Sequence, residues 1–235
     1  MVQILMKKIK IEKPLFIKQQ KNSREAAEFL VSHGANINAK DNNGQTALHK
    51  AAKINSKEII DLLVSHGANI DEKDKDRETA LHKAAIKNSK EAAEFLILHG
   101  ANIDEKEKHG ETALHNTAYY NSKEVAELLV SHGANVDEKN FKGGTALHIT
   151  AWTYSKEVAE ILILHGANID EKDDEGETAL YKAAGKNSKE MVDFFVSHGA
   201  NIDEKDNNGR TALDIANAHY LEEMAKILRS YGAQM

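Results

Sequence analysis

A fixed spacing of 33 residues constrains this sequence more than any other feature. The tetrapeptide Thr-Ala-Leu-His starts at Thr46, Thr79, Thr112 and Thr145, and altered copies start at Thr178 and Thr211. A second element, His-Gly-Ala-Asn, keeps the same step, with glycines at Gly34, Gly67, Gly100, Gly133, Gly166 and Gly199 and an altered copy at Gly232. A constant period of this length predicts stacked structural units, because one such unit is too small to bury a core alone.

The period divides the chain into a short extension and seven units. The extension is 1–7, and units 1 to 7 are 8–40, 41–73, 74–106, 107–139, 140–172, 173–205 and 206–235. Units 1 and 7 are atypical, because Lys18-Gln19 and Asn217 stand where the other units have small, mostly alanine residues. Terminal units of a stacked array need a polar outer face. The sequence therefore predicts that 8–40 and 206–235 are caps and that 1–7 packs over unit 1, with a disordered tail as the alternative for 1–7.

Unit 2 illustrates the expected local structure. Gly44 follows a turn, and Thr46 has the side chain of a helix N-cap. His49 lies three residues later, where its ring can bond back to the cap. Asn55 ends this first helix, and Gly67 ends a second, more apolar helix. Each unit is thus expected to hold a turn followed by two helices.

These motifs resemble the ankyrin repeat, which has this repeat length, a β-turn with two antiparallel helices, and the motif Thr-Pro-Leu-His-x-Ala. The resemblance covers residues 8–235. One departure is alanine at the usual proline position, as at Ala47, and another is Arg77 at a turn glycine position. We expect the Arg77 turn to be strained or differently shaped. The resemblance implies an all-α solenoid of helix–turn–helix units joined by β-turn or hairpin loops.

The resemblance also implies a function. Ankyrin arrays are generally non-enzymatic scaffolds that bind another protein on a concave face, made by the turn tips and the exposed side of the first helices. Units 4 and 5 differ from their neighbours at those positions, where aromatic residues concentrate. We predict that the protein-binding residues are His109, Tyr119, Tyr120, Phe141, Lys142, Trp152, Thr153 and Tyr154.

Three interpretations of this aromatic group stay open. Tryptophan and tyrosine dominate the energetics of protein interfaces, which favours a binding surface centred on units 4 and 5. Neutral drift at permissive surface positions is the second interpretation, since scattered surface aromatics are common. The third is a structural array, natural or engineered, that forms a homo-oligomer through the same patch.

Composition argues against several partners. The net charge is −6 and the isoelectric point is near 6.1, so no basic face is expected to bind nucleic acid. No apolar run has the length that spans a bilayer, so no membrane association is expected. The chain has no cysteine, which excludes disulfides and thiolate chemistry. We expect a cytoplasmic protein, with the nucleus as the alternative.

Catalytic and metal sites are not expected either. Ten of the twelve histidines recur with the period, either at the cap position or before a helix-ending glycine. Zinc ligands must converge on one metal ion, whereas stacked copies are held apart by helix packing. The Asp-Glu-Lys triplets, such as Asp137 to Lys139, recur in the same way and are expected to be solvated turns. The sequence predicts no enzyme activity, no cofactor and no metal.

Overall fold

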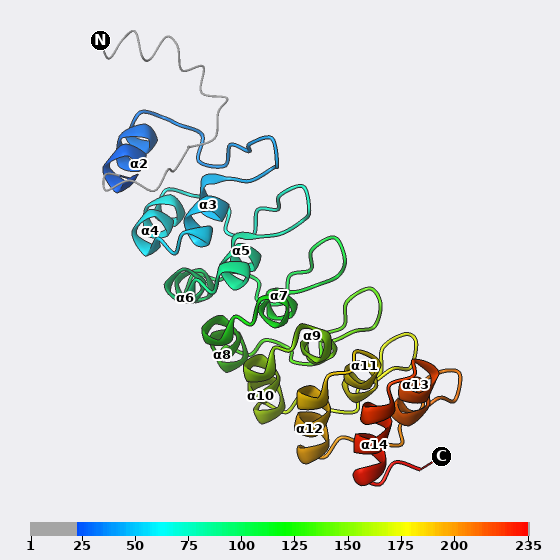
Figure 1. Cartoon of the computed structure of the whole chain (residues 1–235). Helices are drawn as coiled ribbons and strands as arrows, with labels where there is room; N and C mark the ends of the chain where they lie inside the picture. The colour runs from blue at the N-terminus through cyan, green and yellow to red at the C-terminus, as the bar shows by residue number, and fades with distance from the viewer. Residues whose placement is uncertain (1–22, 235) are drawn as a thin grey trace.

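The computed structural model describes residues 23–234, and every regular element in that range is an α-helix. The helices form two rows along a curved array (Figure 1). The inner row contains α3 (Ala47–Lys53), α5 (Ala80–Lys87), α7 (Ala113–Tyr120), α9 (Ala146–Thr153), α11 (Ala179–Gly185) and α13 (Ala212–Ala218). The outer row contains α2 (Ser23–Ser32), α4 (Lys57–Ser65), α6 (Lys90–Leu98), α8 (Lys123–Ser131), α10 (Lys156–Leu164), α12 (Lys189–Ser197) and α14 (Glu222–Ser230).

Each inner helix packs against the next inner helix and against the outer helix that follows it in the chain. The loops that lead from one unit into the next project from the same side of the inner row, and we call them turn loops (Figure 1). Helix α2 belongs to unit 1. The first half of that unit, the Lys18-Gln19 pair and the extension 1–7 lie outside the described residues.

The capping histidines explain why the inner helices begin where they do. His49 Nδ1 accepts a hydrogen bond from the Thr46 backbone N–H at 3.1 Å and lies 2.9 Å from Thr46 Oγ1. Because Nδ1 is an acceptor, the ring proton is on Nε2, which donates to the Glu78 carbonyl of the next unit at 3.0 Å. The same bonds recur at His82, His115 and His148. The predicted hydrogen bonds from the helix N-caps to these histidines are confirmed, and the histidines also connect neighbouring units.

Small buried side chains let the inner helices approach closely. Ala51 and Ala52 of α3 are fully buried, and the equivalent alanines line the rest of the inner row. Thr117 and Thr150 replace the first alanine of the pair in units 4 and 5. Their hydroxyls donate to backbone carbonyls one turn earlier, each at 2.7 Å. A buried hydroxyl with a partner is tolerated, so the core continues unbroken through both units.

The Asp-Glu-Lys triplets connect units rather than standing free in solvent. Asp137 accepts the Asn168 backbone N–H of the next unit at 3.0 Å, and Glu138 pairs with Lys106 of the preceding unit at 2.6 Å. The other copies that accept a backbone N–H from the following unit are Asp71, Asp104, Asp170 and Asp203. The expectation of solvated turns was wrong, because these half-buried acids fill hydrogen-bonding positions that only the stacked neighbour creates.

The turn at Arg77 keeps the shape of the glycine turns. Arg77 adopts a left-handed φ of +62°, close to the +76° of Gly44. Its N–H still donates to the Asp74 carbonyl at 3.0 Å, as the Gly44 N–H does to Asp41 at 2.9 Å. Of the two expected outcomes, the strained turn is therefore found, and the differently shaped turn is not.

Candidate functional site

A groove with a volume of about 830 Å³ lies between the turn loops and the inner helices of units 4 to 7. From units 4 and 5 it is lined by His109, Glu111, Tyr119, Asn140, Phe141, Lys142, Gly144, His148, Ile149 and Trp152. From units 6 and 7 it is lined by Asp173, Glu175, Glu177, Tyr181, Lys182, Gly185, Lys186, Ile215 and His219. The structure thus places a mixed aromatic and charged groove over units 4 and 5, where the aromatic residues concentrate, and extends it into units 6 and 7.

Aromatic rings form the wall of the groove in units 4 and 5. Tyr119 of α7 and Trp152 of α9 make an edge-to-face pair with ring centroids 5.6 Å apart. Trp152 keeps 42% of its surface exposed, and Phe141 keeps 64%. Such exposed rings can bury a large area against a partner at little conformational cost.

The turn loop holds Phe141 against its neighbour. The Phe141 backbone N–H donates to the His109 carbonyl of the preceding loop at 3.0 Å. A Cβ at Gly110 would lie 2.5 Å from the Phe141 ring, so the ring covers this glycine closely. Gly110 also has a φ of +79°, which side chains rarely adopt. Glycine at this position therefore both permits the turn and seats the Phe141 ring.

Glu111 is the acidic group in the aromatic part of the groove. The Tyr119 hydroxyl donates to Glu111 Oε1 at 3.0 Å, and Asn140 Nδ2 lies 3.5 Å from the same oxygen. Within residues 23–234, no lysine, arginine or histidine forms a salt bridge with Glu111. Burial raises the pKa of Glu111, and the nearby Glu107 raises it further. The site thus holds a half-buried carboxylate with hydrogen-bond donors but without a salt bridge, although His109 lowers its pKa slightly from nearby.

Two sibling units show how the array neutralises the same pair of acids elsewhere. In unit 3, Lys83 Nζ lies 2.7 Å from Asp74 and also pairs with Glu78. In unit 6, Lys182 Nζ lies 2.5 Å from Asp173 and 2.7 Å from Glu177. The lysine is built into the inner helix in both cases. It stands one residue after the motif's fourth position, where unit 4 has Asn116.

Comparison with known proteins identifies the architecture. The model of the family described as "Ankyrin repeats (3 copies)" matches residues 15–107, 98–173 and 147–235. The chain belongs to the ankyrin repeat family.

Two solved structures are similar to this ankyrin array. The crystal structure of the ankyrin repeat domain of Bcl-3, described as a unique member of the IkappaB protein family, has a TM-score of 0.76 and 26% identity. That match covers 88% of this chain and 92% of the other. The human ASB11 ankyrin repeat domain has a TM-score of 0.79 and 21% identity, covering 92% of this chain and 96% of the other. A search of curated protein sequences found no significant match. The predicted all-α ankyrin solenoid is confirmed.

Five of the eight predicted site residues line the groove: His109, Tyr119, Phe141, Lys142 and Trp152. The other three do not. Tyr120 is 58% exposed outside the lining, and Tyr154 is 54% exposed at a left-handed φ of +61° after α9. The Thr153 hydroxyl donates to the Ala118 carbonyl of the neighbouring inner helix at 2.8 Å. Thr153 therefore holds helices together, and the two tyrosines are exposed outside the groove.

Three charged residues of the groove were not predicted from the sequence. Glu111, Glu177 and Lys182 contribute to the lining, and none of them stood out as unusual within its own unit. A signal was present in the column of residues after Thr-Ala-Leu-His. That column holds Lys50, Lys83, Asn116, Ile149, Lys182 and Ile215. The loss of lysine in unit 4, with both acids retained, marks the exception.

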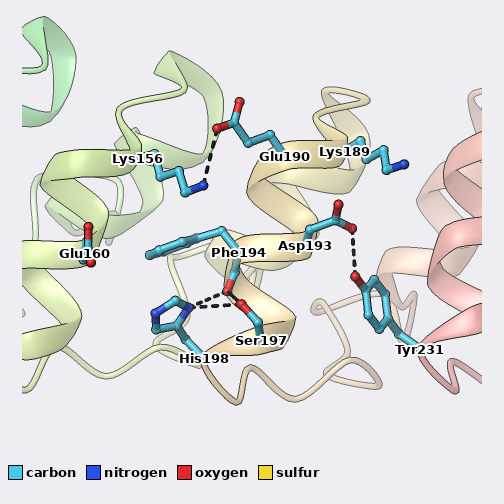
Figure 2. A pocket seen from close by; sticks show the side chains of 9 residues that line it. All are labelled: Lys156, Glu160, Lys189, Glu190, Asp193, Phe194, Ser197, His198 and Tyr231. Carbon is cyan, nitrogen blue, oxygen red and sulfur yellow. Dashed lines mark hydrogen bonds and ion pairs between the residues drawn. The ribbon is translucent and has the colours of Figure 1, made fainter.

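A second hollow, of about 680 Å³, lies on the outer row between α10, α12 and the end of α14 (Figure 2). Most of its polar groups face partners already in place. Lys156 lies 3.5 Å from Glu190, and the Tyr231 hydroxyl donates to Asp193 at 3.0 Å (Figure 2). Its charges are mixed, so its surface has no single chemical preference.

One acidic group among the described residues has the spacing of a cation site. Carboxylate oxygens of Asp74, Asp76 and Glu78 lie within 4.8 Å of one another. The Lys83 ammonium contacts two of these three acids, so the protein supplies the positive charge itself. Within residues 23–234, no helix is long and apolar enough to cross a membrane.

Proposed function

We propose that this chain is a non-catalytic scaffold that binds another protein in the groove, with contacts centred on units 4 and 5. Ankyrin repeat domains generally mediate interactions between proteins. The observation that supports the proposal most directly is the edge-to-face pair of half-buried Tyr119 and exposed Trp152, which lines a groove of about 830 Å³ together with exposed Phe141. An aromatic anchor of this kind contributes on the order of 2 kcal/mol or more to an interface.

Two further features support a protein as the partner. The groove mixes rings with carboxylates and lysines, as the polar rim and apolar centre of protein interfaces do. The net charge of −6 gives no support for nucleic acid, which requires a concentrated positive surface. Absence of nucleic-acid and membrane partners, and a cytoplasmic or nuclear location, stay predictions.

Capture experiments with matched variants test the proposal. The wild-type chain, Trp152→Ala and the control Leu164→Ala are immobilised at equal density, and captured proteins are identified and then titrated as purified partners. Leu164 is 75% exposed on the outer row, so its variant removes an apolar side chain of the opposite face. Trp152→Ala should weaken the purified partner by about 30-fold, and Leu164→Ala should not. Equal loss in both variants, or none in Trp152→Ala, would contradict the proposal.

A second candidate is self-association, and the exposure of Tyr120 and Tyr154 outside the groove favours it. These rings belong to adjacent units, so a second copy of the chain could bury both. Light scattering over a range of concentrations tests this candidate. A concentration-dependent mass that returns to the monomer value in Tyr120→Ala, but not in Leu164→Ala, would support it. A monomer at every concentration would exclude it.

We also propose that the chain consists of the seven units defined above and that 8–40 and 206–235 act as caps. Helices α13 and α14 lie within the last unit, and its polar changes follow the requirement for a soluble end. Deletion of 206–235 should lower solubility and expose the buried face of α11, which binding of a hydrophobic dye would report. Unchanged solubility and dye binding would contradict the capping role.

A further inference from the structure

Unit 4 lacks a positive charge that its two sibling units contain. Units 3 and 6 each hold two acids and one lysine in the same three positions: Asp74, Glu78 and Lys83, and Asp173, Glu177 and Lys182. Unit 4 keeps both acids, as Glu107 and Glu111, but has Asn116 in place of the lysine. The array itself therefore shows that an ammonium group fits beside such a pair of carboxylates.

The replacement leaves Asn116 Nδ2 without a hydrogen-bond partner and leaves both acids without a salt bridge among the described residues. Asn116 is 6% exposed, and its Nδ2 has no hydrogen-bond partner. Glu107 is 5% exposed and accepts the backbone N–H groups of His109 and Glu111. Glu111 is less buried and lines the groove. A partner entering the groove therefore reaches Glu111, while Glu107 adds negative potential from behind it.

Unit 5 shows what happens when the whole set is lost. There, Asn140, Gly144 and Ile149 occupy the positions of the two acids and the lysine. No charge remains, so none needs a partner. Unit 4 is the one complete unit among residues 41–205 in which both acids remain and the residue after the motif is neutral. This internal contrast separates Glu111 from an ordinary solvated acid.

The surroundings of Glu111 favour a cation over a neutral group. Tyr119 donates to Glu111 at 3.0 Å, and the Tyr119 and Trp152 rings lie edge to face at 5.6 Å. Cations are attracted to the faces of tryptophan, tyrosine and phenylalanine. A carboxylate in a half-buried site also gains more from an opposite charge than one in open solvent. The aromatic rings and the carboxylate of Glu111 thus both favour a positively charged group.

From this geometry we infer that the groove takes the basic side chain of a partner protein, a lysine or arginine, beside Glu111 and against the Tyr119–Trp152 pair. The inference rests on the proposed function and names the chemistry of the bound segment. The partner's ammonium or guanidinium supplies in trans the charge that Lys83 and Lys182 supply within the chain. Arginine can form two hydrogen bonds with Glu111, whereas lysine acts as a point charge.

Trp152 provides the signal for a direct test, because it is the only tryptophan in the chain. Three acetylated and amidated five-residue peptides are titrated into the full chain. They differ only in the central residue, which is lysine, arginine or the neutral norleucine, between pairs of alanines. At least one basic peptide should change Trp152 fluorescence saturably and should lose affinity with added salt. The norleucine peptide should bind at least tenfold more weakly.

Three variants locate the response. Glu111→Gln keeps an acceptor for Tyr119 but removes the charge, and it should weaken the basic peptide at least tenfold. Asn116→Lys places an ammonium within the unit and should compete with the peptide to a similar extent. Glu78→Gln is the matched control, because Lys83 already neutralises that acid and it lies outside the groove lining. It should leave the affinity unchanged.

The outcomes separate the inference from the proposed function. Equal binding of the norleucine and basic peptides, or unchanged affinity in Glu111→Gln, overturns the inference. So does the absence of any response to both basic peptides at about 10 mM. If the wild-type chain then still captures a protein that Trp152→Ala does not, the proposed function stands without the charge. If the wild-type chain captures no such protein either, both the inference and the proposed function are overturned.

Discussion

Units 3 and 4 share a backbone and a core but differ in charge. Leu81 and Leu114 are equally buried, and both units begin their inner helix with a threonine and a buried histidine. Only unit 3 balances its acids, since Lys83 occupies the position of Asn116. The residues that recur in every unit therefore build the stack. Asparagine in place of lysine at one position of the inner helix removes a structural ion pair and leaves Glu111 without a salt bridge in the groove.

Core truncation should affect the two units alike and most strongly. Leu81→Ala and Leu114→Ala should each lower the free energy of unfolding by about 2–5 kcal/mol, because each leaves a cavity in a close-packed interior. Urea denaturation followed by circular dichroism measures both. A difference between the two variants larger than about 1 kcal/mol would break the claim that units 3 and 4 share one core.

Removal of the lysine from unit 3 should make that unit resemble unit 4 at a cost. Lys83→Asn leaves Asp74 and Glu78 without their cation, and the Asp74 side chain is almost fully buried. Breaking a buried pair in this way should cost on the order of 3 kcal/mol. The same urea experiment measures it, with Lys87→Asn on the exposed end of α5 as the control. Equal stability of the two variants would show that the unit 3 acids do not need their lysine.

Acid should destabilise both units through the capping histidines. Burial lowers the pKa of His82 and lowers that of His115 to about 4. In the unfolded chain these groups take up protons below about pH 6.5, whereas the folded chain does not until the lower pKa is reached. Stability therefore falls as pH drops through this window, and His115 alone should cost roughly 2 kcal/mol at pH 5.

The measurement is the free energy of unfolding at intervals between pH 7.5 and 4.5. His115→Gln should flatten the slope, since glutamine does not titrate. Glu111 acts in the opposite direction, because its raised pKa means that the folded state takes up a proton more readily as pH falls. An unchanged slope in His115→Gln would show that the buried imidazole is not the acid-sensitive group.

Features of the fold that are determined by residues within a single unit could be predicted from the sequence. Helix starts, helix ends and the fold follow from local caps and a constant period, so they were predicted correctly. Tyr119 and Tyr120 looked equivalent because both follow the Ala-Ala position. A helix turns by about 100° per residue, so only Tyr119 reaches the groove, together with its structural counterpart Trp152.

The acids were harder to predict because their role depends on contacts across several residues. Lys83 pairs with Glu78, which lies five residues earlier, and with Asp74, which is earlier still. The sequence treats these as three separate columns. The hydrogen bond between Asp137 and the backbone N–H of Asn168 likewise forms only when the next unit is stacked, and the same holds for its copies in other units. Sequence reasoning therefore saw charged turns where the structure has connections between units.

Restoring the lysine in unit 4 gives the smallest expected effect and the sharpest test of the comparison. Asn116→Lys should raise the free energy of unfolding by about 1 kcal/mol, because the new ammonium would pair with Glu111 near the surface of the groove. It should also lower the pKa of Glu111, which carboxylate NMR shifts measure directly. Ile149→Lys is the matched control, since Asn140 and Gly144 of unit 5 offer no carboxylate and Ile149 is buried. Stabilisation by Asn116→Lys together with destabilisation by Ile149→Lys would show that the retained acids, rather than the helix position, make unit 4 receptive to a positive charge; equal effects would show the reverse.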